Sequence, residues 1–129
     1  MNYDFSFYMP VNILGGKNAM HNNKNAFSEL GKRCIIVTGS SSAKKSGALD
    51  ELISVLGELN IEYVIFDKIT ENPLTSTCCE GGKVAREFGA DFVFGIGGGS
   101  PLDAAKAVAV YATNPTFSAE DIFNFVMGK

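Results

Sequence analysis

The chain has 129 residues, of which 46% are hydrophobic and 19% are charged, and its formal net charge is −3. These values are typical of one globular domain, here expected over residues 1–129, and they exclude disordered and fibrous chains. The lysines are spread along the chain without a basic stripe, which argues against a nucleic-acid partner. No apolar stretch approaches the ~20 residues that span a bilayer, and the N-terminus lacks a signal-peptide pattern. We therefore expect no membrane partner and a cytoplasmic location.

Five short apolar segments have the composition of β-strands. The first two, at residues 4–8 and 11–14, predict a short N-terminal β-hairpin. The other three, at residues 34–38, 62–66 and 91–96, are nearly continuous in their hydrophobicity. Such runs are typical of strands that are buried on both faces of a parallel sheet.

A segment of helical length follows each of the last three runs. Apolar residues recur at spacings of three and four over residues 47–59, and a weaker version of this pattern covers residues 76–88. A third helix is predicted from residue 101 to about residue 111. The β-α-β-α-β-α order predicts an α/β fold with a doubly wound parallel sheet.

The last part of the chain, residues 113–129, predicts a loop and a short amphipathic helix. Phe123, Phe125, Val126 and Met127 would form its apolar face. An exposed face of this kind favours association, so a homo-oligomer is one expectation.

Ligands of doubly wound sheets bind at the carboxyl ends of the strands. This rule selects three loops, at residues 39–46, 67–75 and 97–100. The last of these loops holds three adjacent glycines, whose backbone N–H groups are little shielded.

The glycine loop leads directly into the third predicted helix. Ser100 is expected to be its N-cap, Pro101 its first residue, and Asp103 the partner of Ser100 in a capping box. A helix N-terminus beside bare glycines is suited to binding phosphate. A tight strand-to-helix turn without a ligand fits the same residues.

Two common nucleotide fingerprints do not fit. Gly95-x-Gly97-x-x-Ser100 imitates the dinucleotide pattern, but it follows the third strand, and no strand-end acid lies about 20 positions later. The stretch GSSSAKKS at residues 39–46 imitates a P-loop, but Lys44 stands where that motif requires glycine.

Three segments together closely resemble the iron-containing (group III) alcohol dehydrogenases. They are VTGSSSAKKSG at residues 37–47, ENP at residues 71–73, and GIGGGSPLDAAKAVAV at residues 95–110. FYMPVNILGG at residues 7–16 is similar to the opening β-structure of the family, so the resemblance covers essentially the whole chain. This combination is far more specific than a single GxGxxG.

The resemblance implies a Rossmann-like domain that binds NAD or NADP. By this resemblance the glycine loop would hold the pyrophosphate, and Asp103 would lie near the nicotinamide. Asn72 would contact the cofactor from the second loop. The expected cofactor-binding residues are Gly39, Ser40, Ser42, Asn72, Gly98, Gly99, Ser100, Pro101 and Asp103.

The position of Gly39 bears on the choice between NADP and NAD. Family members that prefer NAD often carry an aspartate there, which accepts a hydrogen bond from the ribose 2′-OH and repels a 2′-phosphate. Here glycine leaves room, Ser40 and Ser42 offer hydroxyl donors, and Lys44 or Lys45 could add positive charge. We expect NADP to be preferred over NAD; a solvated Ser/Lys loop without a ligand is the alternative.

The resemblance implies that the catalytic metal site lies outside this domain. In the family, one Asp and three His residues of a helical C-terminal domain bind iron(II), which polarises the alcohol oxygen. This domain lies beyond the segment of the family that the chain resembles. The chain has one histidine, His21, which we expect at the surface, and its three cysteines have no zinc-site spacing. We therefore expect no metal ligand and no catalytic residue here, and no activity from these residues alone.

The functional expectation is the NAD(P)-binding domain of an iron-dependent alcohol dehydrogenase, acting on primary alcohols and aldehydes in the complete enzyme. One alternative is a stand-alone, non-catalytic module that binds a nucleotide or dimerises. Another is a relative of glycerol dehydrogenase or dehydroquinate synthase, in which a lysine often stands at the position of Ser100.

Overall fold

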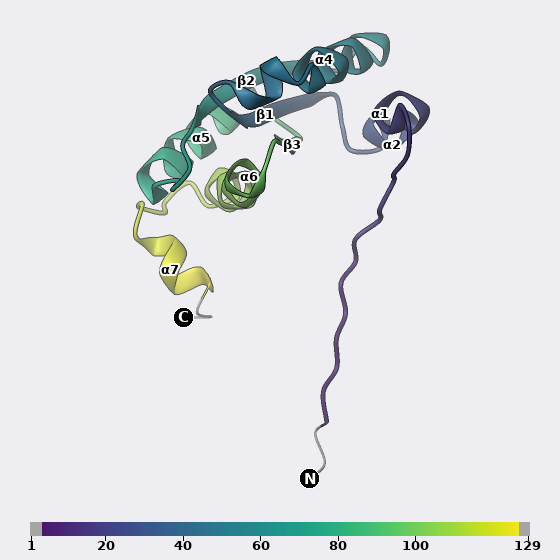
Figure 1. The fold of residues 1–129 in the computed structure, drawn as a ribbon. Coiled ribbons are helices and arrows are strands. Elements are labelled where there is room, and N and C mark those ends of the chain that lie inside the picture. The colour runs from purple at the N-terminus through teal and green to yellow at the C-terminus, as the bar shows by residue number, and fades with distance from the viewer. Residues whose placement is uncertain (1–3, 127–129) are drawn as a thin grey trace.

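The computed structural model describes residues 4–126 (Figure 1). A parallel sheet of three strands carries helices on both faces, as the apolar runs predicted. The strands are β1 (Arg33–Gly39), β2 (Glu62–Ile69) and β3 (Phe92–Ile96), and the long helices are α4 (Ala48–Glu58), α5 (Thr75–Phe88) and α6 (Gly99–Thr113). The short helices are α1 (Ala19–Asn22), α2 (Asn25–Ser28), α3 (Ser42–Lys45) and α7 (Asp121–Val126).

Strand β1 lies at the centre of the sheet, in the order β2-β1-β3, and both of its pairings are parallel. Ile36 is in register with Ile65 of β2 and with Phe94 of β3. The register with β2 shifts between Val37 and Gly39. A central strand has no solvated edge or face, which explains why its sequence is a continuous apolar run.

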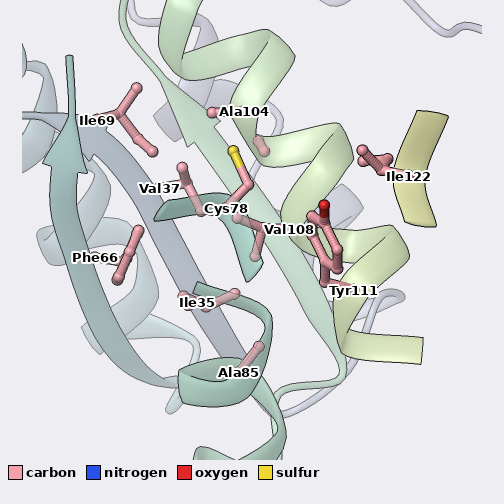
Figure 2. Packing of buried hydrophobic residues seen from close by; sticks show 11 residues of the cluster. Ile35, Val37, Phe66, Ile69, Cys78, Ala85, Ala104, Val108, Tyr111 and Ile122 are labelled. Atoms are coloured by element: carbon pink, nitrogen blue, oxygen red, sulfur yellow. The ribbon is translucent and has the colours of Figure 1, made fainter. Parts of the chain in front are cut away.

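Successive side chains of β1 enter two separate hydrophobic cores. Ile35 and Val37 pack with residues of α5 and α6, including Val108 and Tyr111 (Figure 2). Ile36 packs on the opposite face, with leucines of α4. This alternation follows from the two-residue period of a strand, and it confirms the predicted doubly wound arrangement.

Helices α5 and α6 are in close contact because α5 presents glycines to α6. A Cβ atom at Gly82 would lie 2.5 Å from Cβ of Tyr111, and one at Gly81 would lie 2.8 Å from Val108. The Tyr111 hydroxyl donates to the carbonyl oxygen of Ala119, which joins α6 to the segment before α7. Burial raises the pKa of Tyr111 to about 12, and the nearby ionisable groups add to this shift.

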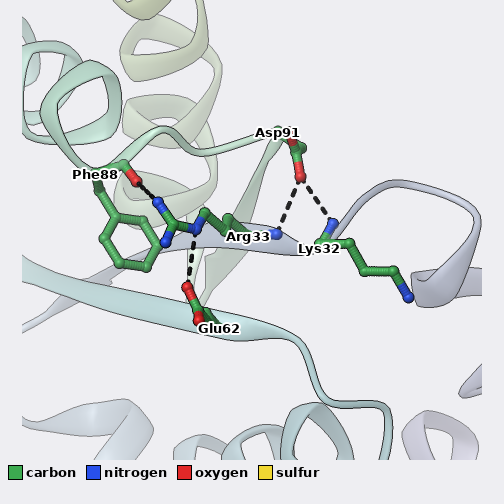
Figure 3. A network of polar contacts seen from close by, with 5 residues as sticks. All are labelled: Lys32, Arg33, Glu62, Phe88 and Asp91. Carbon is green, nitrogen blue, oxygen red and sulfur yellow. Dashed lines mark hydrogen bonds and ion pairs between the residues drawn. The ribbon is translucent and has the colours of Figure 1, made fainter.

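At the amino end of the sheet, Asp91 and Arg33 form a polar network (Figure 3). Asp91 accepts hydrogen bonds from the backbone N–H groups of Lys32 (2.7 Å) and Arg33 (3.1 Å). The Arg33 guanidinium pairs with Glu62 at 2.8 Å and donates to the carbonyl oxygen of Phe88 at 2.9 Å. The hydrogen bonds from Lys32 and Arg33 lower the pKa of Asp91.

The predicted N-terminal hairpin is wrong. Residues 4–15 contain no strand, and they run away from the sheet as an extended segment (Figure 1). Between described residues of this segment, one backbone hydrogen bond forms, from Val11 N–H to the Met9 carbonyl, which is a local turn and not a ladder. Phe5 and Ile13 are each 87% exposed. A hairpin of two strands is marginal without a surface to pack on, and the described residues offer it none.

The predicted capping of α6 is also wrong. The helix begins at Gly99, with Gly98 as its N-cap, so Ser100 already lies in the first turn. The Ser100 hydroxyl donates to the carbonyl oxygen of Glu71 at 2.6 Å, and the Asp103 carboxylate lies 3.4 Å from Nζ of Lys106. The Ser100 hydroxyl therefore does not cap the helix, because it is hydrogen-bonded to Glu71, which lies 29 positions earlier in the chain.

The ends of α4 and α5 lie within two residues of their predicted positions. Helix α6 extends beyond its predicted range in both directions. The predicted amphipathic tail forms as α7, with Ile122 buried and Phe123 exposed. The predictions for the Phe125 and Val126 side chains and for Met127 lie outside the described residues. In residues 4–126, no helix combines the length and apolar character required to cross a bilayer.

Candidate functional site

A cleft of about 570 Å³ lies at the carboxyl edge of the sheet, where the loops after all three strands meet. Its position agrees with the rule that picked these loops from the sequence. The lining residues come from the end of β1 and the start of α3, from β2 and its following loop, and from the glycine loop. They are Gly39, Ser40, Ser41, Ser42, Asp67, Lys68, Ile69, Thr70, Glu71, Gly98, Gly99, Ser100 and Pro101.

Seven of the predicted cofactor-binding residues line this cleft together. They are Gly39, Ser40, Ser42, Gly98, Gly99, Ser100 and Pro101. The other two, Asn72 and Asp103, are exposed and are not part of the lining. The backbone carbonyl of Asn72 accepts a hydrogen bond from the Thr70 hydroxyl at 3.4 Å, so Asn72 stands directly beside the cleft lining.

The glycine loop exposes backbone to the cleft. Gly97 has a φ of +133°, which turns the chain sharply off β3 toward α6. A Cβ atom at Gly98 or Gly99 would meet no atom within 4 Å. The first bond inside α6 runs from Leu102 N–H to the Gly98 carbonyl at 3.3 Å, so the N–H groups before it have no partner within the helix. Open backbone N–H groups at the start of a 15-residue helix fit a phosphate group.

Gly39 forms the wall of the cleft between β2 and α6. A Cβ atom at this position would lie 3.4 Å from the carbonyl oxygen of Ile69 and 4.0 Å from Cγ of Pro101. Both distances are ordinary contacts, so a side chain would fit there and project into the cleft region. Glycine therefore leaves space beside the exposed serines that follow it.

The second loop contributes residues that the sequence alone did not single out. Asp67 and Glu71 both line the cleft, and Lys44 Nζ lies 3.5 Å from Oδ2 of Asp67. Lys68 also lines it, but its Nζ pairs with Glu80 at 2.6 Å, which raises the pKa of Lys68. The sequence offered one signal for Asp67: it is the first residue after the apolar run that ends at Phe66, so it lies where the strand was predicted to end.

The described residues do not fit an iron site. Within residues 4–126, no group of three or more His, Cys, Asp or Glu side chains is placed to hold a metal ion. His21 lies on α1, exposed, with Nδ1 3.8 Å from Glu58. Cys34 is buried in the core, and burial raises the pKa of its thiol to about 11, so it has little thiolate character.

An open parallel α/β sheet has a glycine loop and a helix N-terminus facing a cleft at its carboxyl edge, an arrangement that suits a phosphate-bearing ligand. The comparison with protein families is specific: the sequence pattern described as iron-containing alcohol dehydrogenase matches residues 10–128. The chain belongs to this family.

Individual relatives agree with this assignment. The NADPH-dependent butanol dehydrogenase of Clostridium saccharobutylicum is 33% identical over 116 residues, which are 90% of this chain and 29% of that protein. The NADH-dependent butanol dehydrogenase B of Clostridium acetobutylicum is 33% identical over 87% of this chain and 30% of that protein. The chain thus spans less than a third of the length of these curated relatives.

A solved structure is similar in fold as well as in sequence. The iron-containing alcohol dehydrogenase of Thermotoga maritima superimposes with a TM-score of 0.89 and 41% identity. The match covers 98% of this chain and 35% of that one. The fold described above is therefore shared with about a third of an experimentally determined family member.

Proposed function

We propose that this chain forms the NAD(P)-binding part of an iron-dependent alcohol dehydrogenase. In the complete enzyme it would take part in hydride transfer between a primary alcohol or aldehyde and NADP(H). The observation that carries the proposal is the cleft at the carboxyl edge of the sheet, which is closed on one side by the bare backbone of Gly98 and Gly99.

Different residues of the cleft would contact different parts of the dinucleotide. The N–H groups of the glycine loop and the positive end of the α6 dipole would hold the pyrophosphate. The loop from Gly39 to Ser42 would face the adenosine ribose, and Asn72 and Asp103 would approach from the rim of the cleft. The cofactor supplies the hydride acceptor, and this chain supplies its binding and orientation.

The preference for NADP over NAD is supported by the missing side chain at Gly39 and by the serine hydroxyls beside it. An acidic side chain at Gly39 would repel a 2′-phosphate, and none is present. The named relatives include enzymes that depend on NADPH and on NADH, so the cleft itself must carry the distinction.

The metal ion would be held by the helical C-terminal domain that the family resemblance implies. The described residues contain no group suited to it. Substrate oxidation therefore requires parts of the enzyme beyond the cleft described here.

Calorimetric titration of the chain with NADPH and with NADH tests the proposal. We expect both to bind and NADPH to bind more tightly. Gly98→Asp should weaken both nucleotides by about tenfold or more, because its carboxylate would stand where the pyrophosphate binds. Gly57→Asp is the matched control, since Gly57 is an open helical glycine on α4 outside the cleft. Failure of the unsubstituted chain to bind either nucleotide, or equal losses in both variants, would contradict the proposal.

A further inference from the structure

Asp67, which lines the cleft, forms an ion pair with Lys44 whose role the glycine loop does not explain. Asp67 lies near the carboxyl end of β2, the strand beside β1, and it lines the cleft together with Gly39. In doubly wound nucleotide sites, an acid at the end of a neighbouring strand accepts a hydrogen bond from a ribose hydroxyl. Asp67 has this placement, although Gly39 does not carry an acid.

Lys44, on α3, places a positive charge next to Asp67 without itself lining the cleft. Its Nζ lies 3.5 Å from Oδ2 of Asp67, and the two side chains are 54% and 45% exposed. A half-exposed pair of this kind is weak in water, so a stronger anion can displace the carboxylate from the ammonium group. A 2′-phosphate, which carries up to two negative charges, is such an anion.

The neighbouring cations are less suited to this role. Lys68 Nζ is engaged by Glu80 at 2.6 Å and lies 5.9 Å above the Phe66 ring, which directs it toward α5. Lys45, which like Lys44 is not part of the cleft lining, makes no ion pair with any described residue. Lys44 is therefore the cation held beside the acid of the cleft.

We propose that Lys44 and Asp67 act together as the selector of the nucleotide 2′-group. Lys44 binds the 2′-phosphate of NADP(H), whereas Asp67 repels that phosphate and accepts a hydrogen bond from the 2′-OH of NAD(H). The inference rests on the proposed nucleotide-binding function and deepens it. The preference between NADP(H) and NAD(H) would depend on the opposite charges of Lys44 and Asp67. Gly39 leaves space for the 2′-phosphate, and the Lys44–Asp67 pair discriminates between the 2′-phosphate and the 2′-OH.

Calorimetry on three variants of the chain, at fixed ionic strength, tests this selector. Lys44→Met should weaken NADPH about tenfold and leave NADH within about twofold, because only the phosphate loses a charge-assisted contact. Asp67→Asn should tighten NADPH and weaken NADH, each by a few-fold. Lys45→Met removes the neighbouring lysine, which has no ion pair with Asp67, and should leave the ratio of the two affinities unchanged. The same titrations with adenosine 2′,5′-bisphosphate and with adenosine 5′-monophosphate should give the same changes, since they differ only in the 2′-phosphate.

The outcomes separate this inference from the proposed function. If the unsubstituted chain binds neither dinucleotide, both are wrong. If it binds them but Lys44→Met weakens both equally, or leaves both unchanged, the selector is wrong and the nucleotide site stands. A shift in the ratio for Lys45→Met as large as that for Lys44→Met would also overturn the selector. Circular dichroism of each variant reports the fold, which substitutions of these exposed side chains should preserve.

Discussion

The hydroxyl of Ser100 donates a 2.6 Å hydrogen bond to the carbonyl oxygen of Glu71, which ties the glycine loop to the loop after β2. Both residues line the cleft. The bond fixes the distance between the proposed phosphate site and the loop that carries Asn72. This contact therefore joins two of the loops that line the cleft.

Ser100→Ala removes this tie. We expect a loss of at most about 1 kcal/mol in the free energy of unfolding, since the lost hydrogen bond is exposed and its carbonyl acceptor can bind water instead. We also expect weaker NADPH binding, because the two loops can then separate. Denaturant unfolding and calorimetry measure the two effects. Ser100→Thr keeps the hydroxyl and is the matched control; equal behaviour of the two variants would show that the hydrogen bond does not matter.

Gly82→Ala should destabilise the domain although alanine favours helices. The new Cβ atom would lie 2.5 Å from Cβ of Tyr111 and 2.9 Å from its backbone carbonyl carbon, so α5 and α6 must separate. We expect a cost of about 1–3 kcal/mol in the free energy of unfolding. Gly57→Ala, in open space on α4, should instead stabilise the domain by up to about 1 kcal/mol. Chemical denaturation distinguishes the two, and equal shifts would contradict the close helix contact.

The Asp91 carboxylate should make stability depend on pH. Its two backbone hydrogen bonds lower its pKa in the folded state, so its contribution is present above the unfolded pKa of about 3.9 and is lost as pH falls through the folded pKa. Asp91→Asn should therefore be less stable than the unsubstituted chain at pH 7, and the difference should shrink below about pH 4. Unfolding measured across this range checks the prediction. Asp4→Asn, in the exposed N-terminal segment, is the control, and a difference that stays constant with pH would contradict the account.

Gly39→Asp should reverse the proposed cofactor preference. The side chain would fit without a severe clash, since the nearest atoms to its Cβ are 3.4 and 4.0 Å away, and its carboxylate would face the adenosine ribose. We expect NADPH to bind about tenfold more weakly and NADH to bind at least as tightly as before. Gly39→Asn, of similar size without the charge, is the control. Equal losses for both nucleotides would show that Gly39 acts by space alone.

The buried sheet could be predicted from the sequence because β1 is apolar on both faces, and a short continuous apolar run such as residues 34–38 is typical of a strand that is covered on both sides. The helix ranges were predictable for a similar reason, since Leu49, Leu52 and Leu56 repeat with the period of a helix. The hairpin at residues 4–14 failed because strand-like composition does not supply a surface to pack on.

The contacts within the cleft were less predictable. Ser100 has the local pattern of a cap, and only the fold brings Glu71 within reach of its hydroxyl. Lys44 and Asp67 are 23 positions apart; Lys44 was already a candidate phosphate contact, but nothing in either segment predicts that the two side chains pair. The sequence located the loops that line the site, whereas pairings between loops depend on the crossover connections and on the sheet order.

The proposed function requires a dinucleotide to bind on the exposed backbone of the glycine loop. Titration of the ¹⁵N-labelled chain with NADPH, followed by amide NMR spectra, tests it most directly. We expect saturable shifts of the Gly98, Gly99 and Ser100 amides, while the Gly57 and Gly89 amides, on other elements, remain in place. Saturable binding that leaves the glycine-loop amides unshifted, or the absence of any shift, would contradict it.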